Sequence, residues 1–245
     1  MILVKTFYAY NDLRNFSYLI YDDQKGEAWV IDPYEAGPMI EYIKKNSLEL
    51  KGILNTHQHF DHVRGNAPLQ EAFGSPVQRL RNSQTVFLSQ EQWIETLDTP
   101  GHTMDHKVFL WKSSGAVRAL FSGDTLFNSG VGNCKNGGDV PTLYQTTKML
   151  IDALPEETLL YPGHDYRRRN LEFAHMVEPE NEAVRAELGS LKDVNTHDLG
   201  PVSLAQERKV NPFLRLDSSE LRHHLRIQND EREIFYKLRS LRDSW

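Results

Sequence analysis

Residues 55–62 read Asn-Thr-His-Gln-His-Phe-Asp-His, and this run constrains the fold more than any other segment. Three imidazoles and one carboxylate fall within six positions. Histidines at i and i+2 point to the same side of an extended chain, so His57 and His59 can bind one metal ion together. Asp61 and His62 follow where the chain can turn, and we expect them to face a second ion.

The flanks of this run place it at the end of a strand. The apolar pair Ile53-Leu54 precedes it, and the turn-forming pair Gly65-Asn66 follows it. A solvated loop that merely happens to be rich in histidine would not need these flanks. Ligand clusters at the carboxyl ends of strands are typical of α/β scaffolds. The segment therefore predicts a strand that ends in a metal site.

Composition limits the class of protein. The 245 residues are 39% hydrophobic and 25% charged, which is ordinary for a globular protein. The net charge of −6 argues against a nucleic-acid partner, and the single cysteine, Cys134, excludes an intrachain disulfide. No window approaches the roughly 18 apolar residues of a membrane span, and the N-terminus lacks the layout of a secretory signal. We expect a cytoplasmic monomer with no membrane partner.

Two regimes follow each other along the chain. Residues 1–168 alternate strand-like and helix-like segments, and residues 169–245 lose the strand pattern. This change predicts a mixed α/β domain followed by a small helical domain. In the first domain we expect strands at 17–21, 28–31, 52–54, 108–111, 118–122 and 158–161, and helices at 38–46 (with Pro38 as its first residue) and 143–154. In the second we expect helices at 170–176, 181–191 and 229–243.

Three further donors share one local layout. His102 lies in a Pro-Gly-His-Thr turn, Asp124 in Ser-Gly-Asp-Thr and His164 in Pro-Gly-His-Asp. Asp124 and His164 also come directly after apolar strands. Glycine beside each donor allows the backbone to approach closely where a larger residue would obstruct it. We expect these three side chains to complete the metal site.

This set resembles the metal-binding motif of the metallo-β-lactamase superfamily, which runs His-x-His-x-Asp-His followed by His, Asp and His. The resemblance implies a four-layer αββα sandwich, with two sheets face to face and helices outside. It also assigns each ligand: His57, His59 and His102 to a first metal, Asp61, His62 and His164 to a second, and Asp124 as a bridge between the two.

The remaining histidines and the cysteine need no place at the metals. His106 follows His102 by four residues, which leaves a supporting role open. His175, His197, His223 and His224 lie in helical or polar surroundings and are expected at the surface. Cys134 lies ten residues after Asp124, which already fills the bridging position, so we expect it near the site but not on it.

Two divalent ions close together lower the pKa of a shared water from ~15.7 toward ~7. They also polarise a carbonyl and stabilise the oxyanion that forms. Hydrolysis of an acyl or phosphoryl bond is therefore the expected chemistry. Histidine and aspartate ligands suit zinc, which we expect, and also iron or manganese.

The chain resembles the hydroxyacylglutathione hydrolase (glyoxalase II) family over nearly its whole length, and its C-terminal motifs are specific for this branch. The resemblance rests on Asn211-Pro212-Phe213-Leu214-Arg215, on Asn170-Leu171-Glu172-Phe173-Ala174 and on the ending 235–243. It implies a thioesterase that converts S-(2-hydroxyacyl)glutathione, such as S-lactoylglutathione, to glutathione and a 2-hydroxy acid in methylglyoxal detoxification. It further implies that Tyr166, Arg239 and Arg242 bind glutathione. Independently, Arg239 and Arg242 are three residues apart and share one helix face, where they can bind a carboxylate or simply form a solvated basic surface. We assign catalytic roles to Asp61 and Asp124. Asp61 would accept the proton of the nucleophile.

Three segments depart from the family pattern. Arg64 stands where the family has glycine. Asn133 and Lys135 occupy positions at which the family carries a basic and an aromatic residue for glutathione. The run Arg167-Arg168-Arg169 is also unusual, and we expect a solvated helix start rather than an anion site.

Other functions remain open on the sequence alone. A persulfide dioxygenase of the same superfamily would use a single iron held by His57, His102 and Asp124, but it would lack the 211–215 motif. A non-catalytic, metal-stabilised binding protein would not need two open-faced ions. A nuclease is disfavoured by the acidic net charge.

Overall fold

Two β-sheets lie face to face in the computed structural model, which describes residues 1–228 and 230–245. The first sheet has the order β1-β2-β3-β4-β5 and the second β13-β12-β9-β8-β7-β6. The first contains β1 (Ile2–Tyr8), β2 (Phe16–Asp22), β3 (Glu27–Ile31), β4 (Glu49–Leu54) and β5 (Val77–Gln78). The second contains β6 (Thr85–Phe87), β7 (Gln92–Asp98), β8 (Lys107–Ser113), β9 (Ala116–Gly123), β12 (Leu159–Pro162) and β13 (Val202–Ser203). A hairpin of β10 (Leu126–Phe127) and β11 (Gly130–Val131) follows β9.

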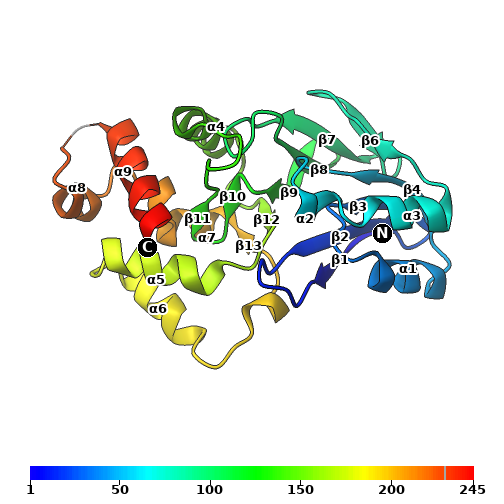
Figure 1. Ribbon diagram of the computed structural model, residues 1–245, viewed down its shortest axis with the longest axis horizontal. Coiled ribbons are helices and arrows are strands. Elements are labelled where there is room, and N and C mark those ends of the chain that lie inside the picture. Colours follow the sequence, from blue (N-terminus) through cyan, green and yellow to red (C-terminus); the bar gives the residue numbers. More distant parts are fainter. Residues whose placement is uncertain (229) are drawn as a thin grey trace.

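Helices cover the outer faces of both sheets, as Figure 1 shows. The first sheet carries α1 (Ala36–Lys45) and α3 (Asn66–Phe73), and the one-turn helix α2 (Phe60–Val63) lies between β4 and α3. The second sheet is covered by α4 (Val140–Ala153) and by the C-terminal helices. These are α5 (Arg167–Val177), α6 (Glu182–Ser190), α7 (Leu204–Val210), α8 (Ser219–Leu225) and α9 (Glu231–Ser244), with 3₁₀ turns η1 (Thr196–Asp198) and η2 (Pro212–Leu214).

The layering follows from the two-residue period of the strands. In β2, Tyr18 and Ile20 point into the layer between the sheets, where they meet Phe109 and Phe121 of the second sheet. The intervening Leu19 points the other way, toward the helices that cover the first sheet. Both faces of β2 are therefore apolar, as expected for a strand buried between two layers.

The outer face of the second sheet and the C-terminal helices share one core. Leu120 of β9 belongs to the same buried cluster as Leu143 of α4, Phe213 of η2 and Phe235 of α9. Truncating a buried phenylalanine such as Phe213 typically costs about 3–5 kcal/mol. The C-terminal helices are consequently tied to the sheets, and the division at residue 168, which falls in the first turn of α5, stays a prediction.

The four-layer αββα sandwich predicted from the resemblance is confirmed. All six predicted strands are present, and α4, α5 and α6 lie where helices were expected. The expectation that Pro38 begins a helix is wrong, because α1 begins two residues earlier at Ala36. The second region is not purely helical, since β13 pairs with β12. The predicted start of the last helix, Asn229, lies outside the described residues.

None of the helices in the two described ranges is long and apolar enough to cross a bilayer.

Candidate metal centre

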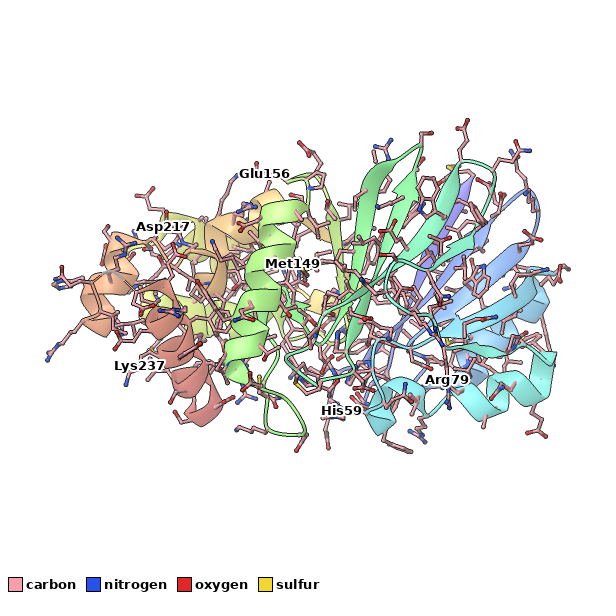
Figure 2. All side chains as sticks on the ribbon, turned by 90° about the horizontal axis from the view of Figure 1, so that it is seen from above. His59, Arg79, Met149, Glu156, Asp217 and Lys237 are labelled. Atoms are coloured by element: carbon pink, nitrogen blue, oxygen red, sulfur yellow. The ribbon has the colours of Figure 1, made fainter. Side chains whose placement is uncertain are left out.

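The predicted ligands come together at the carboxyl ends of three strands. The run with His57 follows β4, Asp124 follows β9 directly, and His164 follows β12. Because β12 and β9 are parallel neighbours, their ends meet at one edge of the second sheet. In Figure 2, His59 lies at the edge of the molecule, between the sheets with their outer helices and the side formed by α4 and α9.

The first predicted set converges on one point. His57 Nε2 lies 2.9 Å from His59 Nδ1, and His102 Nε2 lies 3.0 Å from the same His59 atom. Tetrahedral zinc with bonds of 2.0–2.1 Å places its ligand atoms roughly 3.3 Å apart. The three nitrogens are therefore close enough to bind one ion.

The second set converges beside the first. His62 Nε2 and His164 Nε2 are 3.2 Å apart, and Asp61 Oδ2 lies 3.5 Å from each of them. The two oxygens of Asp124 face different sets. Oδ1 is 3.2 Å from His164 Nε2, and Oδ2 is 3.4 Å from His102 Nε2. This is the geometry of a bridging carboxylate.

The proton positions on the histidines favour metal binding. Thr56 Oγ1 donates to Asp32 Oδ2, so it must accept from His57 Nδ1. His62 Nδ1 donates to the same carboxylate, at 3.0 Å. In both rings the outward nitrogen therefore carries the proton, and Nε2 presents a lone pair to the site.

The other three histidines follow the same rule with backbone carbonyls, which can only accept. The outward nitrogens and their acceptors are His59 Nε2 with Asn136 O, His102 Nδ1 with Asn133 O, and His164 Nδ1 with Leu13 O. When all five rings are neutral, five lone pairs thus face one another at about hydrogen-bond distance with no proton between them. Such an arrangement is repulsive unless cations lie among them, so these residues fit two bound metal ions.

Asp124 supports the same conclusion. Its Oδ1 is buried and has no hydrogen-bond partner within the described residues, which is costly unless a cation binds it. Burial alone would raise the pKa of this carboxyl, but positive charge at the His164 and His62 positions holds it well below its usual range, and cations bound between neutral rings would supply that charge. Burial also lowers the pKa of His57, so that ring is neutral and can bind a metal.

Two glycines make the close approach possible. A Cβ at Gly163 would overlap Asp124 Oδ1, and one at Gly123 would overlap Thr56 Oγ1. Gly123 also has φ +48°, a conformation that L side chains rarely adopt. The expectation that glycine lets the backbone approach the donors holds at both positions.

Two supporting residues were not predicted from the sequence. Asp32 accepts from the Thr56 backbone N–H as well as from Thr56 Oγ1 and His62, and thereby fixes both ends of the ligand run. Asn15 Nδ2 donates to Asp61 Oδ2 at 2.9 Å. The signal for Asp32 was its place directly after the apolar strand β3, the same layout that identified Asp124.

His106 takes the supporting role that the sequence left open. Its ring is buried and stacks on His57 with centroids 5.0 Å apart. Its Nε2 accepts from the Asp124 backbone N–H. Cys134 is half-buried, and burial raises the pKa of its thiol to about 11, so it is no thiolate at neutral pH.

A cavity of about 340 Å³ opens beside the second metal set. The Tyr166 ring stacks on His164 at 5.0 Å and lines this cavity together with Phe127 and Arg242. Arg242 Nε and Nη2 donate to Asn170 Oδ1. The predicted substrate residues therefore line one cavity, and one of them, Tyr166, contacts the candidate metal ligand His164.

Arg239 lines the same cavity but is engaged by the protein. Its buried guanidinium donates from Nη1 to the carbonyls of Val131 and Gly132, and Nη2 forms an ion pair with Asp243 at 2.9 Å. Lys135 Nζ donates to the Asp243 backbone oxygen. Arg239 thus holds the loop whose next residues present carbonyls to His102 and His59.

The basic run at the start of α5 is only partly solvated. Arg167 forms an ion pair with Glu187, and Arg168 donates to the carbonyls of Leu191 and Val194. Arg169 is exposed. Arg64 is also exposed, and its guanidinium lies 4.7 Å from the centre of the Tyr34 ring.

Comparison with known families identifies the chain. The family model described as "Hydroxyacylglutathione hydrolase C-terminus" matches residues 165–245, and that of the metallo-β-lactamase superfamily matches residues 10–94. The chain is 37% identical over 265 residues to a hydroxyacylglutathione hydrolase of Polaromonas sp., with both chains covered completely. It is 32% identical to a cytoplasmic hydroxyacylglutathione hydrolase of Arabidopsis thaliana, over 94% of this chain and 95% of the relative.

Solved structures agree on the fold. A metallo-β-lactamase from Staphylococcus aureus superposes with a TM-score of 0.69 at 20% identity, over 97% of this chain and 66% of the other. ETHE1 from Myxococcus xanthus superposes with a TM-score of 0.66 at 23% identity, over 99% of each chain. At these identities the likeness concerns the fold alone.

Proposed function

The chain belongs to the hydroxyacylglutathione hydrolase family of the metallo-β-lactamase superfamily, and from this we propose that it hydrolyses S-(2-hydroxyacyl)glutathione thioesters such as S-lactoylglutathione. The products are glutathione and a free 2-hydroxy acid. The observation that carries this proposal is a pair of ligand sets joined by Asp124, next to a cavity lined by Tyr166 and Arg242.

Two bound divalent ions would supply a water of lowered pKa and stabilisation of the oxyanion. His57, His59 and His102 would hold one ion, and Asp61, His62 and His164 the other, with Asp124 shared. Zinc is the proposed metal, and iron or manganese would suit the same donors.

The protein's own residues position the substrate. Burial raises the pKa of the Tyr166 phenol well above its ordinary value, so the hydroxyl keeps its proton and can donate a hydrogen bond to the peptide. Arg242 retains donors that Asn170 does not use, and these can bind a carboxylate of glutathione. Arg239 contributes by holding the loop at residues 131–132 and adds positive charge to the cavity.

Asp61 is the proposed acceptor of the proton from the attacking water. Its Oδ2 faces the second set, accepts one hydrogen bond from Asn15 and can take the proton of the attacking water. A thiol with a pKa near ~8.5 leaves as thiolate at neutral pH, so the reaction needs no strong general acid.

The single-iron dioxygenase is less well supported. It would use His57, His102 and Asp124 only, and would leave His62 and His164 without a role. We propose instead a role in methylglyoxal detoxification, in the cytoplasm and as a monomer. The relative from Arabidopsis thaliana is described as cytoplasmic, and the nucleic-acid and membrane partners that the sequence disfavours play no part in this chemistry.

A thioester assay tests the proposed function. Metal-loaded protein should hydrolyse S-lactoylglutathione, as measured by loss of thioester absorbance, and should lose this activity after chelation and regain it with added zinc. Absence of hydrolysis with every tested metal, or activity that survives complete metal removal, would contradict the proposal.

A further inference from the structure

Two cavities on the face of α5 share one wall. The cavity of about 340 Å³ beside His164 and a neighbouring one of about 500 Å³ are both lined by Asp12, Tyr166, Arg169 and Trp245. Together they form a trough that begins beside Tyr166, whose ring stacks on His164, and continues past the first turn of α5. A substrate bound at the first cavity therefore has room to extend over Arg169.

The trough carries an excess of positive charge in a chain whose net charge is −6. Its basic residues are Arg14, Arg168, Arg169, Arg239, Arg242 and Lys135. Its acidic residues are Asp12, Glu172 and Asp243. Asp243 already pairs with Arg239. In the cavity of about 500 Å³, the basic residues Arg14, Arg168 and Arg169 therefore face two acidic residues, Asp12 and Glu172.

Arg169 is the arginine that lines both cavities. It is exposed, and within residues 1–228 and 230–245 no Asp or Glu side chain forms an ion pair with it. Its guanidinium lies 5.8 Å from the centre of the Trp245 ring, and Nη2 donates to the Trp245 backbone oxygen at 3.4 Å. The indole thus orients a planar, doubly donating cation over the trough.

Positively charged side chains lie close together where the two cavities meet. Burial, together with the positive charges of Arg169 and Arg239, lowers the pKa of the Arg242 guanidinium to about 10. Trp245 lies against both Arg242 and Arg169, which brings both guanidinium groups near the centre of one ring, at 5.3 and 5.8 Å. Two cations held near each other are stabilised by a ligand that supplies negative charge at two points.

We propose that Arg169, supported by Trp245, binds the α-carboxylate at the γ-glutamyl end of the thiol carrier, and that Asp12 accepts the adjacent ammonium. This inference rests on the proposed function, in which Arg242 takes the carboxylate at the other end of glutathione. Glutathione has a carboxylate at each end, and the trough has Arg242 in its first cavity and Arg169 where it continues into the second. Recognition of both charges of an α-amino acid requires one cation and one anion, and Asp12 is the acid that borders both cavities.

The test compares thioesters that differ only at this end. S-lactoylglutathione is compared with the same thioester of N-acetylcysteinylglycine, which lacks the γ-glutamyl amino acid, and with that of N-glutarylcysteinylglycine, which keeps the carboxylate but lacks the ammonium. All three have an acylated cysteine nitrogen, so the acyl group cannot migrate to it. The measured quantity is kcat/KM for each thioester.

Arg169→Ala should lower kcat/KM for S-lactoylglutathione about five- to twenty-fold, mainly through KM, since an exposed charge-assisted hydrogen bond is worth less than a buried one. The N-acetyl thioester should be hydrolysed as by wild type. Arg169→Lys should restore part of the loss because it keeps the charge but not the two-pronged geometry. Asp12→Asn should slow only the thioester that carries the ammonium.

Arg185→Ala is the matched control, since it removes an exposed arginine of α6 that lines neither cavity. It should leave all three values unchanged. Equal effects of Arg169→Ala on the glutathione and N-acetyl thioesters, or no effect on either, would overturn this inference while leaving the proposed function intact. A wild type that hydrolyses the two equally well would do the same. A wild type that hydrolyses none of them would refute both.

Discussion

Replacing Arg239 and Arg242 one at a time by alanine should produce two different defects, although both side chains line the same cavity. Arg239 is 4% exposed, and its donors are used by the carbonyls of residues 131 and 132 and by Asp243. Arg242 is only partly buried and contacts one amide oxygen, that of Asn170. The first arginine is therefore expected to be structural and the second to bind substrate.

The size of each effect follows from these contacts. Removing one partner of a buried, hydrogen-bonded ion pair costs about 3–5 kcal/mol. Since Asp243 is partly exposed, we expect the lower end for Arg239→Ala, about 3 kcal/mol, which corresponds to a fall in Tm of about 6–12 °C for a chain of this length. Arg242→Ala loses a bond to a neutral amide, worth about 1 kcal/mol of stability. Its loss of a charge-assisted contact to substrate should raise KM roughly ten- to a hundred-fold.

Metal content separates the two variants further. The loop that Arg239 holds continues to Asn133 and Asn136, whose carbonyls fix the proton positions of His102 and His59. Arg239→Ala should therefore also weaken metal binding, whereas Arg242→Ala should not. The assays are thermal unfolding, elemental analysis after dialysis, and steady-state kinetics with S-lactoylglutathione. An Arg239→Ala variant with unchanged Tm and metal content but a raised KM would refute this division of roles.

Three further changes test other parts of the account. Asp124→Ala should abolish activity and weaken both metal sites, because one side chain serves both; retention of both ions with near-normal activity would exclude a bridging role. Asp32→Asn should lower metal affinity about 10- to 100-fold in a chelator competition, since it weakens the support of His62 and Thr56; unchanged affinity would show that this support is dispensable. Burial raises the pKa of Glu207 from 4.5 to about 7, so the folded protein favours the protonated acid and stability falls as pH rises from about 4.5 to 7, by up to about 3 kcal/mol. Glu207→Gln should flatten the dependence of Tm on pH between 5 and 8, and an unaltered pH dependence would contradict the shift.

The candidate metal ligands could be identified from the sequence because their signals are local. His57, His59, Asp61 and His62 lie within one short run, and Asp124 and His164 each follow an apolar strand and a glycine. The i,i+3 spacing of Arg239 and Arg242 predicted that they share one helix face, and both line one cavity. The superfamily resemblance then supplied the layer architecture, which periodicity alone could not give.

The missed features depend on contacts between distant segments. Arg239 is engaged by carbonyls more than a hundred residues away, which no spacing within its helix can indicate. The carbonyls of Leu13, Asn133 and Asn136 support the histidines through the backbone, so their side-chain identities give no signal. The strand β7 was overlooked because its sequence, Gln-Trp-Ile-Glu-Thr-Leu-Asp, has neither a strict alternation of polar and apolar residues nor a continuous apolar run.

The number of metal ions bound per chain is the most direct test of the central claim. Purified protein loaded in turn with zinc, iron and manganese, and dialysed against metal-free buffer, is analysed for elemental content alongside His164→Ala and His62→Ala variants. The account predicts about two ions per wild-type chain and about one in each variant, because His62 and His164 belong to the second set while His57, His59 and His102 keep the first. A single ion per wild-type chain, unaffected by either substitution, would contradict it.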